Sequence, residues 1–460
     1  MSARQYRKVA AIALVTTVGL SLAACSSSTK SNSGTNASGK TTIVVDCAPL
    51  KTQGNNLALP QFKADIATFE KSHPDVTIIP ESVGSQCDNP PDFTARLQAG
   101  TEADVYYGYF TDLGQILDAG QAEDITKYID TTTLPNWSSV DGNWKNVFQS
   151  SGEQYGIPTS NYSMGLVYNK KLFQQAGIST PPTTWQDVAT DAKAIAALGN
   201  GIYGYADYSA GNTGGWHFTA EMYSRGGDDV TADGKTADFD NPTGQAVLQQ
   251  LYDMRWKDNS VGTKQLLQWP DLLTLAGAGK VGMYLGAPDS ITAIVTQFKG
   301  SYGDWAMSAM PGDNGPAKGA LAGGNGYFFK KGDTPAQIKA GLEWLSFEYL
   351  TPGQGQFNYP NLQAQQAPVG LPEPQLFTSG SAADQQQQQL EKQYENVDPA
   401  DYQAFVKAAI PPVPEPPNAQ AIYAILDGVM SSVLTQQNAN IPQLLKNASD
   451  KVNTLLKSSS

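Results

Sequence analysis

The chain has 460 residues with 40% hydrophobic composition, a length that exceeds one small core and predicts two compact domains. Its formal net charge of −13 disfavours nucleic acid as a partner, because that contact needs clustered lysine and arginine to displace counterions. The same acidic balance disfavours a surface built for anionic ligands, although it leaves room for a local basic pocket.

The N-terminus has the pattern of an export signal. Three basic residues precede an apolar run over residues 9–24, which is too short for a spanning helix. The run ends in LAAC (22–25), which resembles the bacterial lipobox, in which the cysteine is acylated. We therefore predict a signal peptide over 1–24, a lipid anchor at Cys25 and a flexible Ser/Gly-rich linker over 25–40. The alternative is an ordinary cleaved signal in which the cysteine is incidental.

The next segment predicts a strand, a helix and a second strand. TTIVV (41–45) and VTII (76–79) have the apolar pattern of buried strands, and apolar residues recur at helical spacing over 62–69. Strands in such a unit run parallel, so their carboxyl ends share one sheet edge. Cys47 and Cys87 each follow one of these strands, which predicts a disulfide bond at that edge. The alternative is two separate buried thiols.

Alternation of strands and helices continues along the chain. ADVYY (103–107) predicts a third strand, and apolar stripes over 422–433 and 441–455 predict two helices at the C-terminus. In open α/β sheets, ligands bind outside the carboxyl ends of the strands. This rule singles out Asp46 and Tyr109, which lie at or after such ends.

Several apparent motifs do not support metal or catalytic chemistry. The segment 229–240 imitates a calcium loop, but it ends in Asp240 instead of the usual bidentate glutamate. An Asp-Gly turn between two short strands explains it better, and incidental metal binding there stays open. His73 and His217 are the two histidines of the chain, so we expect no histidine-based metal site and no cofactor. No G-x-S-x-G or H-E-x-x-H motif is present, whereas a catalytic carboxylate pair stays open.

The stretch 155–188 is the most specific part of the sequence. It contains YGIP, then VYNKKLF, AGI and PPTTW in this order. The order and spacing resemble the signature of family 1 extracellular solute-binding proteins, the maltose-binding-protein-like receptors of ATP-driven importers. The resemblance extends to AGAGKVGMYLGAPDS (276–290), to 305–329 and to 342–356, and so covers nearly the whole chain after the linker.

The resemblance implies a type II two-lobed periplasmic-binding-protein fold of the α/β class. Each lobe would be a mostly parallel sheet flanked by helices, and crossover segments would join the lobes as hinges. These crossovers would lie near 158–163, 310–311 and 349–353. The lobes would comprise 41–158 plus 311–349, and 159–310 plus 350–460.

The resemblance also implies a ligand site in the cleft between the lobes. Trp216 is the strongest candidate, since its Gly-Asn-Thr-Gly-Gly-Trp loop shows no helical or strand stripe that would bury it. Tyr107 alternates with Val105, so it has a packing alternative. Where maltose-binding proteins carry aromatic rings, this chain has GAP (286–288), so the ligand need not be maltose. The predicted ligand-binding residues are Asp46, Tyr107, Tyr109, Asn161, Tyr162, Trp216, Gly286, Asp289, Gly324, Asn325, Asn418 and Tyr423.

Together these features predict a non-enzymatic, lipid-anchored receptor outside the cytoplasm, which captures a mono- or oligosaccharide and delivers it to the permease of an ABC transporter. The 21 Tyr and 8 Trp fit such a role, because ring faces stack on the C–H faces of sugars. A monomer is expected. Three alternatives remain: a receptor for a cationic or zwitterionic solute, a secreted glycoside-processing enzyme, and a sensory or scaffolding lipoprotein.

Overall fold

The computed structural model describes residues 34–35, 39–49, 58–82, 84–85, 87 and 90–458. The predicted signal peptide, Cys25 and most of the predicted linker lie outside these residues. Residues 33–460 form one compact unit. Among the helices of the described part of the chain, none combines the length and the apolar character needed to cross a membrane.

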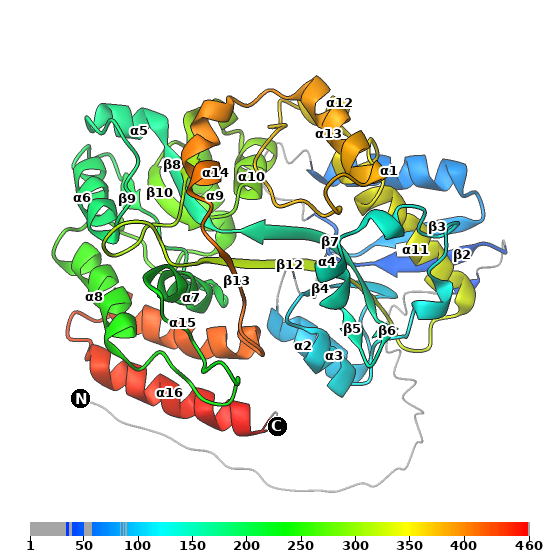
Figure 1. Cartoon of the computed structure of the whole chain (residues 1–460), viewed down its shortest axis with the longest axis horizontal. Helices are drawn as coiled ribbons and strands as arrows, with labels where there is room; N and C mark the ends of the chain where they lie inside the picture. The colour runs from blue at the N-terminus through cyan, green and yellow to red at the C-terminus, as the bar shows by residue number, and fades with distance from the viewer. Residues whose placement is uncertain are drawn as a thin grey trace, which may run out of the picture. The chain divides into compact units, whose positions relative to one another are not determined.

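The first sheet has seven strands, most of them on the right in Figure 1. They are β1 (Gly34–Thr35), β2 (Thr41–Val45), β3 (Val76–Pro80), β4 (Val105–Tyr109), β7 (Gly156–Ser163), β12 (Ala320–Phe329) and β13 (Pro412–Pro414). β2 pairs in parallel with β3 and β4, as expected for the predicted strand–helix–strand unit. β12 pairs antiparallel with β4 and β7 and parallel with β13.

The second sheet has four strands in the order β11 (Trp305–Ser308), β8 (Gly165–Asn169), β10 (Val281–Gly286) and β9 (Tyr203–Tyr205). Its β9 and β10 run parallel, whereas β8 runs antiparallel to both of its neighbours. A short hairpin of β5 (Gln149–Ser150) and β6 (Glu153–Gln154) stands apart.

One detail of the predicted architecture is corrected by these pairings. Both sheets mix parallel and antiparallel pairs and are not mostly parallel. The physical reason lies in the connections between the sheets. β7 leads out of the first sheet, and β12 leads into it from the second sheet. β12 runs antiparallel to both β4 and β7.

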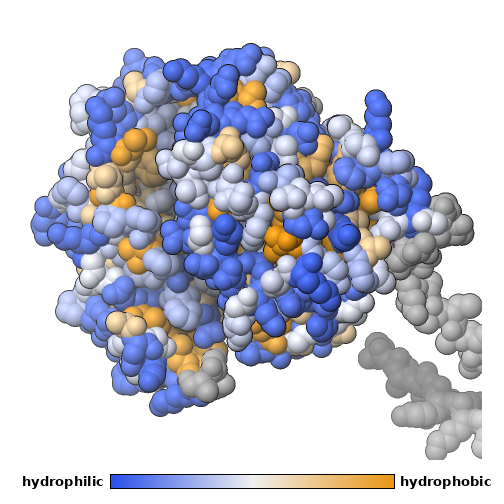
Figure 2. Space-filling view, turned by 45° about the vertical axis from the view of Figure 1, so that its right-hand side comes forward, coloured by the Kyte–Doolittle hydropathy of each residue, from blue (hydrophilic) through white to orange (hydrophobic). Residues whose placement is uncertain are grey.

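Helices cover both sheets, and hydrophilic residues dominate the face in Figure 2, where hydrophobic residues form only small patches. The helices that precede β7 or lie between β12 and residue 395 are α1 (Ala58–Ser72), α2 (Pro90–Ala99), α3 (Leu113–Asp118), α4 (Gly142–Asn146), α11 (Pro335–Tyr349), α12 (Tyr359–Ala364) and α13 (Ala382–Tyr394). The others are α5 (Lys170–Gln175), α6 (Trp185–Ala196), α7 (Thr213–Arg225), α8 (Pro242–Trp256), α9 (Trp269–Gly277), α10 (Asp289–Phe298), α14 (Gln403–Ala408), α15 (Ala419–Thr435) and α16 (Ile441–Ser458). Short 3-10 turns occur at Thr126–Tyr128, Trp137–Ser139, Tyr302–Asp304, Gly355–Phe357 and Pro399–Tyr402.

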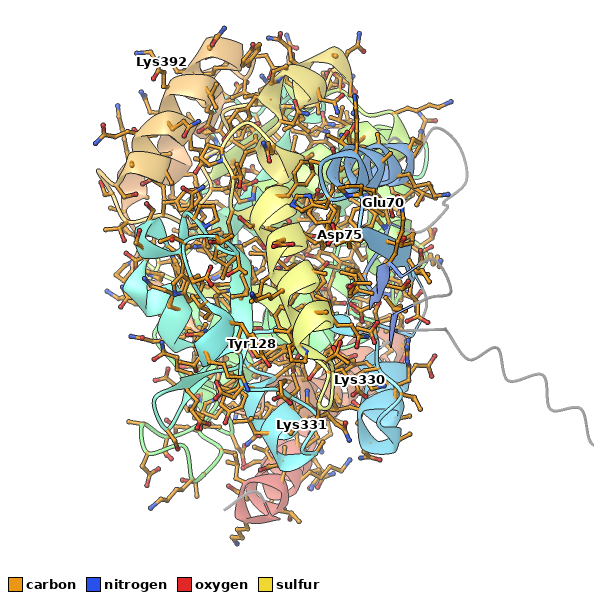
Figure 3. The ribbon with its side chains drawn as sticks, turned by 90° about the vertical axis from the view of Figure 1, so that its right-hand side faces the viewer. Glu70, Asp75, Tyr128, Lys330, Lys331 and Lys392 are labelled. Carbon is orange, nitrogen blue, oxygen red and sulfur yellow. A yellow bond between two sulfur atoms is a disulfide. The ribbon has the colours of Figure 1, made fainter. Side chains whose placement is uncertain are left out.

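The apolar run in β2 reflects burial on both faces of the first sheet. Ile43 and Val45 belong to a core under α1 and α11, while Val44 belongs to a second core on the opposite face. α11 runs along the first of these faces, beside α1 and the segment that holds Tyr128 (Figure 3). A strand covered on both sides lacks polar alternation, which is why this run was readable in the sequence.

The predicted helix over 62–69 and the predicted disulfide bond are both confirmed. Phe62, Ile66 and Phe69 are buried on the inner face of α1. Cys47 and Cys87 form a disulfide bond with their Cα atoms 5.9 Å apart. The bond closes a loop of 40 residues, which on the chain-entropy account stabilises the folded chain by roughly 4 kcal/mol.

Three segments connect the two sheets. β7 passes into β8 with only Met164 between them. Residues 309–319 lead from β11 of the second sheet to β12 of the first. The chain returns to the second sheet after α13, where Val397, Tyr402 and Phe405 pack against its core.

The packing of residues 350–394 differs from the expected lobe division. We expected the whole of 350–460 in the second lobe, but Phe357, Val369, Phe377 and Ala383 are buried in the core of the first sheet. Hydrogen bonds agree with this packing, since the Asn136 amide donates to the Leu350 carbonyl oxygen at 3.0 Å. The return near residue 350 was inferred from the family pattern alone, and these apolar side chains pack on the core of the first sheet instead.

Candidate functional site

The β4 strand carries a row of tyrosines toward the predicted site. Tyr107 and Tyr109 lie on one face of the strand, with ring centroids 5.5 Å apart, and Tyr106 is buried on the other face. Tyr327 extends the row, with its ring 5.7 Å from that of Tyr107. Tyr107 therefore packs partly on the core and partly toward the carboxyl end of the strand, so core packing and ligand binding are both compatible with its position.

Asp46 supports this row from behind. Its side chain is 2% exposed, and its Oδ1 accepts a hydrogen bond from the Tyr107 backbone N–H at 2.7 Å. Burial raises the pKa of Asp46 to about 8, although the Tyr107 N–H and the distant Arg96 charge oppose the rise. In this structure Asp46 thus orders the tyrosine strand and is screened from solvent.

Two strands end opposite each other over the glycines of β12. β13 runs along β12 as far as the pair Pro414–Ala322, and β4 runs toward it as far as the pair Tyr109–Asn325. Gly323 and Gly324 lie in the gap between these two ends. The carboxyl ends of β4 and β13 therefore meet at one place, where a ligand is expected in an α/β sheet.

The missing side chains of these glycines leave room for larger groups. A Cβ on Gly324 would lie 2.4 Å from the Phe110 ring. A Cβ on Gly323 would lie 2.6 Å from both the Tyr162 hydroxyl and a Glu415 carboxylate oxygen. The glycines are thus required by close approach, and two aromatic residues and one acid occupy the space.

Amide side chains line the same part of β7 and β12. Asn325 Oδ1 accepts hydrogen bonds from the hydroxyls of Thr159 and Ser160, both at 3.0 Å. Asn161 donates through Nδ2 to the Gln375 carbonyl oxygen at 3.2 Å. Its buried Oδ1 has no hydrogen-bond partner among the described residues, so it is an acceptor available to a ligand or water.

Trp216 approaches this group from the second sheet. Its indole N–H donates to the Tyr162 hydroxyl at 2.9 Å, and the two rings meet edge to face. The predicted loop around Trp216 is in fact the first turn of α7, and the ring is half-buried against both cores of the second sheet. The preceding glycines hid this helix, because they favour loops but here let α7 approach α15: a Cβ on Gly215 would lie 2.3 Å from the Tyr423 Cα atom.

The start of α15 completes the wall beside Trp216. Tyr423 is buried, and its hydroxyl donates to Glu415 Oε1 at 3.1 Å. Asn418 precedes the helix with a φ of 57° and is half-buried. Glu415 was not among the predicted ligand-binding residues. The available signal was a single acid inside PPVPEPP (411–417).

The turn after β10 supplies an acid from the second sheet. Gly286 ends the strand, and Asp289 begins α10. Asp289 and Glu373 are reached by solvent, yet enclosure by protein raises the pKa of both, that of Glu373 to about 8. The charge of Asp289 adds to the rise at Glu373, so these two acids lie close together. Glu373, which was not among the predicted residues, lies within the segment that packs on the first core, between Val369 and Phe377.

The predicted residues therefore converge from both sheets. Burial is the main cause of the raised pKa of Tyr107 and of Tyr109, and the charge of Asp289 adds to the rise at Tyr107 while those of Asp112 and Glu415 add to the rise at Tyr109. The assembled groups are aromatic rings, amides and acids whose pKa values lie well above the ordinary range, without a lysine or arginine. Such a lining can stack on apolar faces and exchange hydrogen bonds with a neutral polar ligand.

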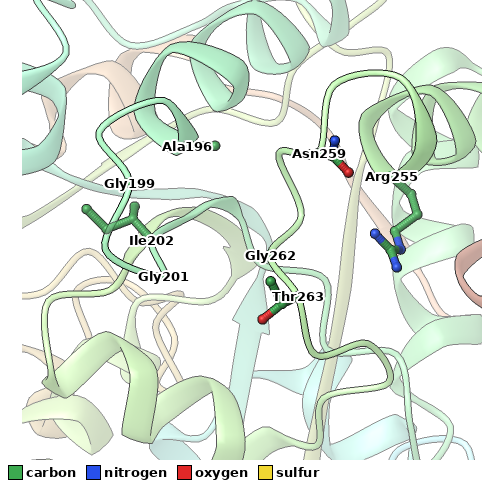
Figure 4. A pocket seen from close by; sticks show the side chains of 8 residues that line it. All are labelled: Ala196, Gly199, Gly201, Ile202, Arg255, Asn259, Gly262 and Thr263. Carbon is green, nitrogen blue, oxygen red and sulfur yellow. The ribbon is translucent and has the colours of Figure 1, made fainter.

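Two other features lie apart from this lining. A pocket of about 350 Å³ between the ends of α6 and α8, lined in part by Arg255, Asn259 and Thr263, contains none of the predicted ligand-binding residues (Figure 4). In the segment 229–240, Val230 and Ala237 form an antiparallel bridge, which matches the predicted turn between short strands. Within the described residues, no three acidic, histidine or cysteine side chains are grouped to hold a metal ion.

Sequence comparison identifies a family. The model of a family described as bacterial extracellular solute-binding protein matches residues 55–348. Binding proteins from Brucella abortus (strain 2308) and Brucella suis biovar 1 (strain 1330) are each 28% identical over 239 residues. This alignment covers 50% of the chain and 54% of each relative, so the chain spans about half the length of the curated relatives that it matches.

Structural comparison extends over nearly the whole chain. An ABC transporter solute-binding protein from Thermotoga lettingae TMO, bound with alpha-D-tagatose, has a TM-score of 0.69 at 20% identity, covering 90% of this chain and 99% of its own. The Listeria monocytogenes substrate-binding protein in complex with cycloalternan gives 0.69 at 18%, covering 91% and 99%. The GacH receptor of Streptomyces glaucescens GLA.O, solved with acarbose, gives 0.68 at 18%, covering 90% and 98%. At these identities the likeness shows the fold, and it confirms the predicted two-lobed α/β class.

The buried acid at the first sheet predicts a pH effect on stability. The pKa of Asp46 in the folded chain, about 8, exceeds its unfolded value of 3.8, so the folded state holds an extra proton between these values. The free energy of unfolding should therefore fall as pH rises through this range. Asp46→Asn cannot ionise and should lose less stability between pH 5 and pH 8, by on the order of 1.4 kcal/mol per pH unit.

Urea unfolding at the two pH values measures this difference. Asp450→Asn, which removes an exposed acid on α16, is the matched control and should follow the unmodified chain. Parallel loss of stability in Asp46→Asn and in the unmodified chain would show that Asp46 is ionised throughout.

Proposed function

Because the chain belongs to the bacterial extracellular solute-binding protein family, we propose that it captures a carbohydrate between its two lobes and delivers it to the permease of an ABC transporter. The family consists of binding proteins, and this role needs no chemical step. The single observation that carries the proposal is the contact of Trp216 with Tyr162, because Trp216 lies on α7, which packs on the second sheet, whereas Tyr162 lies on β7 of the first sheet.

The chemistry of the lining supports a sugar as the ligand. Ring faces of Trp216, Tyr107 and Tyr109 match the C–H faces of a pyranose. The free Oδ1 of Asn161 and the acids with raised pKa values match hydroxyl groups, which both donate and accept hydrogen bonds. The structures of similar fold that were solved with tagatose, cycloalternan or acarbose support the same ligand class.

The lobes are proposed to follow the hydrophobic cores, so β13, although it pairs with β12 of the first sheet, is assigned to the second lobe, on whose core Val413 packs. The first comprises residues 41–158 with the strands and helices from 320 to 394, and the second comprises 165–318 with 395–458. The three connecting segments would then serve as hinges. A sugar that contacts both lobes favours the closed arrangement by its differential affinity for that arrangement.

A second ligand class has one specific observation in its favour. Asp289 and Glu373 are neighbouring acids that water reaches, and a cationic group between them would relieve their mutual repulsion. A positively charged or zwitterionic solute is therefore the competing candidate. The raised pKa of Glu373, about 8, argues against it, since an acid that is protonated near neutral pH attracts a cation weakly.

A ligand screen tests the proposal directly. Thermal unfolding of the purified full chain with a library of sugars, amines and betaines should show a rise in melting temperature with one or more sugars, because a ligand of the folded state alone stabilises it. Solution scattering with that sugar should show a smaller radius of gyration. Stabilisation by amines alone would favour the competing ligand class, and conversion of the sugar into products would favour the enzyme alternative.

Replacement of Trp216 tests the site. Trp216→Ala removes a stacking platform and should weaken sugar binding roughly 10- to 100-fold, since burial of a large apolar side chain contributes about 1.5–3 kcal/mol. Trp216→Phe keeps a ring but loses the N–H, so it should have a smaller effect. Calorimetry with the sugar from the screen measures both.

Trp256→Phe is the matched control for the second variant. Trp256 ends α8 and is not one of the lining residues. Its indole N–H donates to the Val433 carbonyl oxygen at 2.9 Å, the same distance as the Trp216–Tyr162 bond, and the variant loses this N–H. It should bind the sugar as the unmodified chain does. Equal affinities for all three variants would place the ligand elsewhere.

Anchoring to the membrane belongs to the same proposal. The LAAC motif supports acylation of Cys25, and a membrane-held receptor stays close to its permease. Cys25→Ser should move the protein from the detergent phase to the aqueous phase in a phase-separation assay without changing its melting temperature. Continued partition with detergent would contradict lipidation at this position.

A further inference from the structure

Glu415 occupies the gap over the glycines of β12. It directly follows β13, whose last pair is Pro414–Ala322, so it lies opposite Gly323. The segment is the one that returns the chain to α15 of the second sheet. One carboxylate therefore lies where a strand of the first sheet, the β7 segment and two helices of the second sheet come together.

Tyr162 lies between this carboxylate and Trp216. The Trp216 indole donates to the Tyr162 hydroxyl at 2.9 Å. A Cβ on Gly323 would lie 2.6 Å from both that hydroxyl and Glu415 Oε2, so the two groups are neighbours, and the interaction with the phenol lowers the pKa of Glu415. The Tyr423 hydroxyl donates to Glu415 Oε1 at 3.1 Å. One acid thus lies against two phenols, and one of these phenols is the acceptor of the indole.

No cation offsets the charge of Glu415 among the groups that act on it. The facing groups are Tyr109 on β4, Asp112 before α3, Tyr162 on β7, Tyr223 on α7 and Tyr423 on α15. Burial raises the pKa of Glu415 to about 7, and Asp112 adds to the rise, while the two phenol hydrogen bonds lower it. The acid therefore changes its charge within the neutral range.

We propose that Glu415 is a positioning residue of the ligand site, which orients the Trp216 ring through the Tyr162 hydroxyl. The inference rests on the proposed function, because it assigns a role within that same site. The ionised carboxylate accepts hydrogen bonds from both tyrosines. The protonated acid gains a donor and loses acceptor capacity, so one of the tyrosines must find another partner, and the indole loses its fixed geometry.

The indole N–H of Trp216 reports this change without any ligand. In ¹⁵N-tryptophan-labelled full chain, its resonance is identified as the peak that disappears in Trp216→Phe. The resonance should shift between pH 6 and pH 8 with a midpoint near 7 in the unmodified chain. In Glu415→Gln, which keeps the shape but cannot titrate, the shift should be absent. The Trp256 resonance should stay in place throughout, and Asp450→Asn should behave as the unmodified chain.

Two outcomes would overturn the inference: a Trp216 resonance that does not titrate in the unmodified chain, or one that titrates equally in Glu415→Gln. If Glu415→Gln does not fold, Tyr162→Phe serves instead, because it keeps the acid but removes the link, and it should also abolish the shift. Persistence of the shift in Tyr162→Phe would likewise overturn the inference. These results are independent of the ligand screen, so failure of the screen and failure of the positioning role remain distinguishable.

A ligand arm deepens the test. With the sugar from the screen, affinity should fall several-fold from pH 8 to pH 6 in the unmodified chain beyond any change in Glu415→Gln. A purely structural role would instead lower affinity equally at both pH values.

Discussion

The pairing of β12 is the constraint on which the site depends. On one edge it binds β7, and on the other it binds β13 and β4, which approach from opposite directions and stop on either side of Gly323 and Gly324. The register of the pairing fixes which residues face this gap, since a slip of one residue would move each side chain to the opposite face of the sheet. The register thus brings together Phe110, Tyr162 and Glu415, which are far apart in the sequence.

An acidic chain can build an uncharged polar site when burial outweighs the hydrogen bonds that favour ionisation. Enclosure by protein raises the pKa values of Asp46, Glu373 and Glu415 to between about 7 and about 8, and the Arg96 charge offsets only part of the rise at Asp46. Such carboxyl groups act as donors as well as acceptors near neutral pH. The net charge of the chain therefore says little about the charge of the ligand that the site prefers.

Local features of the fold were predictable from the sequence, and features set by register were not. β2, the buried stripe of α1 and the disulfide bond follow from short apolar patterns and strand order, and the structure confirms them. Trp216 was found as a candidate but placed in a loop, because Gly214 and Gly215 lower helix propensity while tertiary contact with α15 restores the helix. Glu415 was missed because its neighbours are assembled only by pairing with β12, and the mixed direction of both sheets was missed for the same reason.

α7 connects the ligand wall to the second crossover. Trp216 lies in its first turn, and Arg225 in its last turn forms an ion pair with Asp313 in the crossover segment. The Lys318 backbone N–H donates to the Ser224 carbonyl oxygen at 2.9 Å, so the segment is held to the same helix end up to its last residues. Ala320 and Leu321, which follow this segment, are buried in the same core as α7, so the start of β12 is tied to the second sheet as well. One helix thus holds the Trp216 ring at its first turn and the crossover segment at its last turn.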